Sequence, residues 1–147
     1  MNKIKILFDS YHLYHLPQFD PVINLLSKDD MFEVFHSTCS ENKKEEVELS
    51  LLILKSKPGE LIFADSEIER IKKIRKLNLD VFICGWSRYP ISQFVSDKTL
   101  VAMIYHGIGV KPSYWRDNSD RLNIRFVEGQ YRIDQLRENG VKTKLEL

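Results

Sequence analysis

The sequence predicts an α/β fold in which helices cover both faces of a parallel sheet of six to seven strands. Short apolar runs rich in β-branched and aromatic residues alternate along the chain with longer stretches of helical spacing. Most short runs are nearly continuous in apolar residues, as expected for parallel strands buried on both faces. No internal repeat, linker or charge-biased tail interrupts the alternation. These observations predict a doubly wound, Rossmann-like sheet that occupies residues 1–147 as one domain.

The strand predictions follow the apolar runs in chain order. The fourth and fifth runs are the clearest, because Val81–Cys84 and Val101–Ile104 contain no polar side chain other than a thiol. A seventh strand is predicted at Lys142–Leu147. The other six strands are predicted at Lys3–Phe8, Phe32–Ser37, Glu60–Ala64, Asp80–Cys84, Leu100–Tyr105 and Asn123–Val127.

Helices are predicted between these strands. Ser66 and Glu69 have capping-box spacing, and Ile68, Ile71, Ile74 and Leu77 then form an apolar stripe along one helix face. Asn139-Gly140 is a typical C-terminal cap for the last helix. The five helices are predicted at Phe19–Leu26, Lys43–Leu54, Ser66–Leu77, Ile91–Val95 and Gln130–Asn139.

The composition is that of a globular protein and excludes a disordered, collagen-like or low-complexity chain. The 147 residues include 22 Lys and Arg and 21 Asp and Glu, a formal net charge of +1, so no global charge attracts nucleic acid. Cys39 and Cys84 cannot build a disulfide framework or a zinc knuckle, and two reduced thiols suit a cytoplasmic protein. No apolar run has the length of a signal peptide or a membrane span. We therefore expect a cytoplasmic location, with any membrane contact peripheral and at the inner face.

The segment after the first strand is polar and aromatic and lacks the GxGxxG fingerprint of a dinucleotide site. His12 and His15 lie three residues apart near Asp9, which is one arrangement of metal ligands, but no Glu or third His completes a known spacing. We therefore expect no metal and no resident cofactor. Two interpretations remain: the His and Tyr side chains of this segment line a crevice or cap the first helix, or His12 or His15 hydrogen-bonds a phosphate or sugar. After the fourth strand, Gly85 and the aromatic residues Trp86 and Tyr89 either shape a pocket wall or cover the strand end.

The fifth strand leads into the most distinctive segment. His106 is followed by Gly107, Gly109 and Lys111, and Arg116 comes shortly after. Glycines at such a turn allow backbone N–H groups to approach an anion, and a lysine adds a mobile positive charge. A histidine there can accept a proton from an attacking hydroxyl. The alternative is a turn that needs glycine for its backbone conformation and carries an incidental histidine.

Five cations lie within seven residues of the third predicted helix. Such a run usually forms a solvated helix face. The alternative is a surface that attracts anionic lipid headgroups or a polyanionic substrate. The residues are Arg70, Lys72, Lys73, Arg75 and Lys76.

His106-Gly107 through Lys111 resembles the His-Gly-Thr-x-x-Lys motif of the CDP-glycerol glycerophosphotransferases, the teichoic-acid polymerase and primase group. Ile108 stands where that motif has Thr. The stretch from Arg125 to Leu136 with Asn139-Gly140 is similar to the segment that closes the N-terminal lobe of these and other GT-B enzymes. The resemblance runs across most of the chain and is specific from Tyr105 to Gly140.

The resemblance implies the N-terminal, acceptor-side lobe of a GT-B transferase. Such an enzyme moves glycerol phosphate from CDP-glycerol, or another nucleotide-activated donor, to a hydroxyl of a polyol-phosphate or glycan acceptor in the cell envelope. His106 would be the catalytic base, while Lys111 and the turn amides of Gly107 and Gly109 would hold a phosphate. Residues 1–147 do not include the second lobe, so we expect either a truncated product or one domain of a longer protein, and we expect this chain alone to be inactive.

Two other functions are compatible with the same residues. One is a GT-B enzyme that uses a UDP-sugar, either a glycosyltransferase or an enzyme of the UDP-N-acetylglucosamine 2-epimerase type. The other is a stand-alone module that holds an anionic ligand at the His-Gly turn without catalysis.

Overall fold

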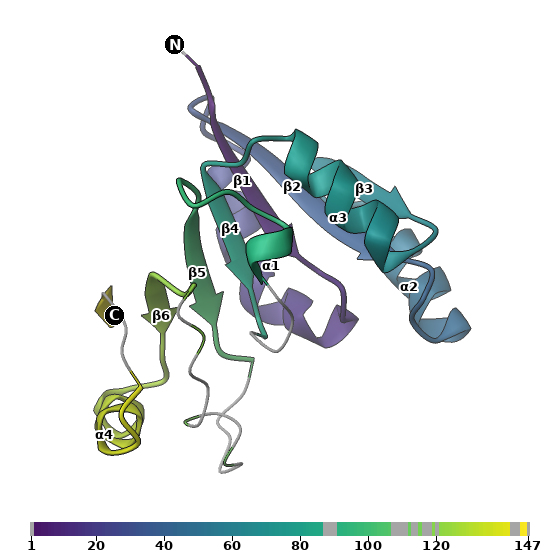
Figure 1. Cartoon of the computed structure of the whole chain (residues 1–147). Coiled ribbons are helices and arrows are strands. Elements are labelled where there is room, and N and C mark those ends of the chain that lie inside the picture. The colour runs from purple at the N-terminus through teal and green to yellow at the C-terminus, as the bar shows by residue number, and fades with distance from the viewer. Residues whose placement is uncertain are drawn as a thin grey trace.

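A parallel β-sheet forms the centre of the computed structural model, which describes residues 2–86, 91–106, 112, 115, 119, 121–141 and 145–146 (Figure 1). Within these residues the sheet has seven strands in the order β3-β2-β1-β4-β5-β6-β7. All neighbouring strands pair in parallel. The strands are β1 (Ile4–Asp9), β2 (Phe32–Cys39), β3 (Glu60–Ala64), β4 (Val81–Cys84), β5 (Leu100–Ile104), β6 (Ile124–Phe126) and β7 (Leu145–Glu146).

The strand order reverses direction beside β1. The chain proceeds outward from β1 to β2 and β3, then returns to pair β4 with the other edge of β1. In doubly wound sheets, ligands bind beyond the carboxyl ends of the strands at such a reversal. The arrows of β1, β4 and β5 end at one edge of the sheet, which is the lower edge in Figure 1. This edge is therefore the place where a doubly wound fold would bind a ligand.

Helices and two 3₁₀ turns connect the strands. The helices are α1 (Leu16–Leu26), α2 (Lys44–Leu54), α3 (Glu67–Lys76) and α4 (Gln130–Glu138), and the 3₁₀ turns are η1 (Leu13–His15) and η2 (Ile91–Gln93). None of the helices in the described part of the chain is long and apolar enough to span a membrane.

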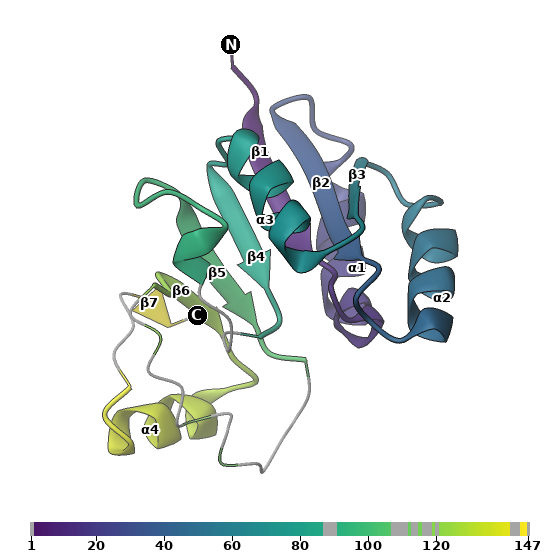
Figure 2. The same ribbon diagram turned by 45° about the vertical axis from the view of Figure 1, so that its right-hand side comes forward.

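Two apolar cores lie on opposite faces of the sheet. Successive side chains of a strand point to opposite faces, so Ile6 and Phe8 of β1 belong to one core and Leu7 to the other. α1 and α2 cover the Ile6 face, where Phe19 and Leu54 are buried. α3 and η2 cover the Leu7 face, and Figure 2 shows α3 crossing in front of β1 and β2. The fold is α/β and Rossmann-like, as the sequence predicts.

Several element boundaries differ from the predicted ones. The first helix begins at Leu16 rather than Phe19, because Pro17 lies in its first turn, where proline loses no hydrogen bond. The predicted helix at Ile91–Val95 is a single 3₁₀ turn, Ile91–Gln93. The predicted cap of the last helix is present: Asn139 is the C-cap, and Gly140 follows with a φ of +69°.

α3 begins at its predicted cap, and Ile71, Ile74 and Leu77 of the predicted stripe pack on the core. The Ser66 hydroxyl accepts the backbone N–H of Glu69 at 3.2 Å. Ile68 is 67% exposed, so the predicted stripe does not begin there, and Arg70 and Ile74 are the buried residues of this helix. A three-residue repeat falls short of the 3.6-residue helical turn, so the stripe rotates around the helix and only part of it faces the sheet.

Candidate functional site

Three histidines meet at the carboxyl edge of β1, β4 and β5. His12 and His15 follow β1, and His106 follows β5. The ring centroids of His15 and His106 are 4.8 Å apart, and those of His12 and His15 are 5.9 Å apart. Side chains separated by more than 90 residues therefore form one cluster, here called the histidine cluster, beside the strand-order reversal.

Gly85 lies directly after β4 and makes the close contact between the strands and the cluster. A Cβ atom at this position would lie 2.7 Å from two carbons of the His15 ring, so a larger residue would displace that ring. The carbonyl of Gly85 also faces Nδ1 of His106 at 2.9 Å. Gly85 thus contacts two of the three histidines.

The contact with Gly85 fixes the tautomer of His106. A carbonyl oxygen only accepts hydrogen bonds, so Nδ1 of His106 must carry the hydrogen in this interaction. In the neutral ring the lone pair then belongs to Nε2.

His15 is the buried centre of the cluster, with 1% of its surface exposed. Neither of its ring nitrogens has a hydrogen-bond partner in the described part of the chain. Burial, together with the nearby His106 and His12 imidazoles, lowers the pKa of His15 to about 3. His15 is accordingly a neutral imidazole at physiological pH.

His12 contacts a carboxylate on α2. Its Nδ1 lies 3.3 Å from Oε1 of Glu46, and the same carboxylate oxygen accepts the backbone N–H of Leu13 at 3.2 Å. The Nδ2 atom of Asn42 also lies 3.3 Å from Nδ1 of His12. Because Nδ1 cannot both donate to Glu46 and accept from Asn42, we assign it as the donor in the charge-assisted bond to Glu46.

Two further aromatic side chains border the cluster. Tyr14 contacts all three imidazoles, with ring centroids 5.0 Å from His12, 4.5 Å from His15 and 5.2 Å from His106. Trp86, after β4, lies 5.5 Å from His12. Tyr14 is 52% exposed, whereas the imidazoles are partly or fully buried. Tyr14 therefore covers the histidine cluster on its solvent side.

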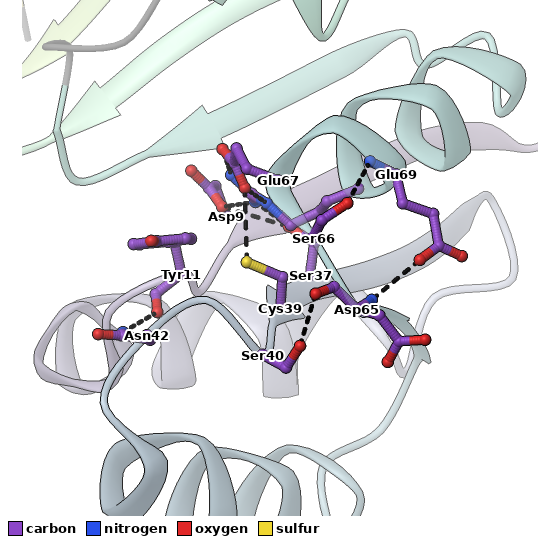
Figure 3. Close-up of polar contacts among 11 residues, drawn as sticks. Asp9, Tyr11, Ser37, Cys39, Ser40, Asn42, Asp65, Ser66, Glu67 and Glu69 are labelled. Atoms are coloured by element: carbon purple, nitrogen blue, oxygen red, sulfur yellow. Dashed lines mark hydrogen bonds and ion pairs between the residues drawn. The ribbon is translucent and has the colours of Figure 1, made fainter.

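A second polar cluster lies nearby on the α3 side of the sheet and is built around a buried ion pair (Figure 3). The Arg70 guanidinium contacts the Asp9 carboxylate, and both side chains are fully buried. Arg70 also donates to Ser37 Oγ at 2.9 Å and to both Glu67 oxygens at 2.6 and 2.7 Å. The rings of Tyr11 and Phe94 lie 5.1 and 4.8 Å from its guanidinium carbon. Arg70 thus joins α3 to the carboxyl ends of β1 and β2.

The charges in this second cluster affect each other strongly. Burial raises the pKa of Asp9, and the Arg70 cation opposes that rise. Burial alone would lower the pKa of Arg70, but Asp9 and Glu67 raise it overall. Burial likewise raises the pKa of the neighbouring Cys39 thiol to about 11, so this cysteine is not an activated nucleophile.

The positions predicted from the sequence divide into three groups. His12, His15 and His106 come together in the histidine cluster. Arg70 is buried with Asp9 and so lies outside the exposed basic face of α3, which consists of Lys72, Lys73, Arg75 and Lys76. Gly107, Gly109, Lys111 and Arg116 lie outside the described residues.

The sequence does not indicate a role for Glu46 in the site, and it gives Tyr14 and Gly85 only general roles, Tyr14 in lining a crevice and Gly85 in a pocket wall. The signal for Tyr14 was its position between two histidines, and that for Gly85 was a glycine directly after a buried strand. Glu46 gave no signal, because its role depends on how α2 packs beside the loop after β1.

Comparison with known proteins adds no assignment to this geometry. No protein-family model matches the sequence, and no curated protein shows significant similarity to it. The function must therefore be inferred from the side chains at the carboxyl edge of the sheet and from the motif that begins at His106.

Proposed function

We propose that the chain is the acceptor-side lobe of a GT-B transferase that resembles the CDP-glycerol glycerophosphotransferases. In this proposal His106 is the general base for an acceptor hydroxyl. The observation that carries the proposal is the hydrogen bond between Nδ1 of His106 and the Gly85 carbonyl, which leaves the Nε2 lone pair to take the proton.

The proposed reaction is a phosphoryl-group transfer. As Nε2 of His106 accepts the proton, the acceptor oxygen attacks the phosphorus of the glycerol phosphate group of CDP-glycerol. The bond from that phosphorus to CMP breaks, and CMP leaves with the bonding electron pair. Lys111 and the amides of the following glycine turn are predicted to stabilise the phosphate charge.

The position of His106 supports the proposal independently of its tautomer. It follows β5 at the carboxyl edge of the sheet, near the β1/β4 reversal where doubly wound folds bind ligands. His12 and His15 line the same position. A base at this edge would meet a substrate bound in the crevice of the fold.

His106→Asn is the sharpest test, because the Asn amide places a donor near the position of Nδ1 but supplies no basic nitrogen. The full-length gene product would be assayed for transfer from CDP-glycerol to a polyol-phosphate acceptor. Loss of a proton acceptor at the reaction centre is expected to slow transfer by about 10²- to 10⁴-fold. His36→Gln, at a buried histidine on β2, is the matched control, because the Gln amide keeps a donor near the Pro58 carbonyl that Nε2 of His36 contacts at 2.7 Å.

The alternative outcomes of this assay separate the competing functions. Unchanged turnover in His106→Asn would overturn the role of His106 as base. Preferential use of a UDP-sugar would place the chain in a sugar-nucleotide enzyme instead. Binding of a phosphorylated ligand without turnover of any donor by the full-length product would favour a non-catalytic module.

We also propose that the enzyme acts in the cytoplasm at the inner face of the membrane, where its acceptor is anchored. The exposed cations of α3 support this location, because a basic helix face attracts anionic headgroups. Lys73 is partly neutralised by Glu69, whose carboxylate lies 2.8 Å from its ammonium. The attraction would therefore come mainly from Lys72, Arg75 and Lys76.

A further inference from the structure

His15 breaks a general rule of protein interiors. Buried polar atoms are nearly always hydrogen-bonded, because leaving one unpaired costs free energy. Both ring nitrogens of His15 are buried without a partner among the described residues. A phenylalanine ring would fill similar space without this cost, so packing alone does not explain a histidine here.

The hydrogen-bonding groups of a neutral imidazole determine which ligand groups can pair with the His15 ring nitrogens. The neutral ring presents one N–H donor and one lone-pair acceptor. The hydroxyls of a polyol are complementary, because each can accept from the N–H or donate to the lone pair, whereas a phosphate would bring a negative charge against a buried neutral ring. The two imidazoles in contact with His15 do not favour an anion there either, because His12 is bonded to the Glu46 carboxylate and Nδ1 of His106 is bonded to a carbonyl.

The walls of the cluster suit an uncharged ring or chain of carbons bearing hydroxyls. The aromatic rings of His12 and His106 lie against His15 at centroid distances of 5.9 and 4.8 Å. Trp86 extends this aromatic wall beside His12. Ligand sites are commonly lined in this way, by apolar and aromatic groups with a few fixed polar atoms.

Tyr14 is the most exposed ring in contact with His15, and it lies on the single 3₁₀ turn η1. It also contacts the His12 and His106 rings. A movement of Tyr14 that breaks these contacts would expose part of the imidazoles, and it requires no rearrangement of the sheet.

We propose that His15, covered by Tyr14, is a binding subsite for a hydroxyl group of an uncharged polyol or sugar. The sequence analysis leaves open whether His12 or His15 binds a phosphate or a sugar. The present proposal assigns a sugar or polyol, and not a phosphate, to His15. The statement that this polyol or sugar is part of the transfer acceptor rests on the proposed function. The statement that it binds at His15 is independent of that function.

The test measures the ¹⁵N resonances of the His15 ring while glycerol, myo-inositol or inorganic phosphate is added to the chain. The two polyols are expected to shift both ring nitrogens in a saturable manner, and phosphate is expected to leave them in place. His15→Phe keeps the ring and removes both nitrogens, so it should weaken polyol binding by about tenfold or more while the melting temperature stays the same or rises. Tyr14→Ala should tighten binding severalfold.

Tyr131→Ala is the matched control for Tyr14→Ala, because Tyr131 is 48% exposed on α4, outside the histidine cluster. It should leave polyol binding unchanged. The proposal is overturned if phosphate shifts the His15 ring at lower concentration than the polyols do. Equal polyol binding by His15→Phe and the parent chain, or no polyol binding even in Tyr14→Ala, would overturn it as well.

Transfer assays separate this proposal from the proposed function. If His106→Asn abolishes transfer while His15→Phe keeps the acceptor KM, the subsite is wrong and the transferase function stands. If polyols bind through His15 but the full-length product transfers nothing from any donor, the subsite stands and the transferase function is wrong.

Discussion

The rings of His15 and His106 lie with their centroids 4.8 Å apart, and both contact Gly85. The two contacts differ in kind: His15 packs against the glycine, and His106 hydrogen-bonds its carbonyl. The residue after β4 therefore sets the positions of two imidazoles that come from β1 and β5. This shared contact links the packing of the sheet edge to the chemistry proposed for His106.

Gly85→Ala tests that link. The added methyl would lie 2.7 Å from the His15 ring, so the ring or the strand end must move. Overpacking of this kind typically destabilises a protein by about 1–3 kcal/mol. Urea unfolding of the single variants and of Gly85→Ala/His15→Ala would measure the coupling. The double variant should be less destabilised than the sum of the two single variants, because removing the ring leaves room for the methyl.

Strictly additive effects in this cycle would mean that the alanine methyl does not meet the His15 ring. The same variants also test the position of His106. A displaced Gly85 carbonyl should weaken the hydrogen bond to Nδ1 and change the ¹⁵N shifts of the His106 ring.

His15 should make folding stability depend on pH in the acid range. Its pKa is about 3 in the folded protein, mainly because of burial, and near 6.5 in an unfolded chain. The unfolded state therefore binds a proton that the folded state refuses, and the free energy of unfolding falls as pH drops from about 6.5 toward 3. The loss approaches about 1.4 kcal/mol per pH unit within that window.

Urea titrations at several pH values between 7 and 4 would measure this slope. His15→Phe should remove the contribution of His15 and flatten the curve. His36 is also buried with a lowered pKa, so some pH dependence remains in the variant. Identical slopes in the variant and the parent chain would show that His15 is protonated in the folded state.

The sequence predicts the sheet well because its signals are local. A parallel strand buried on both faces is nearly continuous in apolar residues, and Val81–Cys84 and Leu100–Ile104 show this directly. The same reasoning places His12, His15 and His106 after strand ends. That they touch depends on β4 lying between β1 and β5, a strand order that no local pattern contains.

The orientation of α3 shows where local patterns are insufficient. Three isoleucines and a leucine at three-residue spacing predict an inward face that includes Ile68, yet Ile68 is exposed and Arg70 is buried. The deciding contact is Asp9, 61 positions earlier in the chain, whose buried carboxylate needs a cation. A basic run read from the sequence cannot show which of its members such a partner draws inward.

Arg70→Met should be strongly destabilising. It leaves the Asp9 carboxylate buried without its cation, and breaking a buried pair in this way costs about 3–5 kcal/mol. The double variant Asp9→Asn/Arg70→Met removes both charges and should recover part of this loss. Thermal or urea unfolding would measure the three free energies, with Lys73→Met on the exposed face of α3 as a control that should change stability by less than about 1 kcal/mol. A cost for Arg70→Met no larger than that of the control would show that the pair is not buried in solution.

The exposed cations of α3 should determine any binding to anionic membranes. Lys72→Glu/Lys76→Glu reverses two charges on the solvent side of the helix, away from the buried Arg70. Each basic residue near an anionic surface contributes about 1 kcal/mol, so the double reversal should reduce binding by tenfold or more. Co-sedimentation with vesicles of phosphatidylglycerol and phosphatidylcholine would measure this binding, and the binding should weaken as salt rises.

The control variant Lys3→Glu/Lys28→Glu carries the same charge change at exposed positions outside α3 and should bind as the parent chain does. Equal loss in both double variants would indicate attraction by net charge alone, and no binding by the parent chain at low salt would rule out the membrane contact.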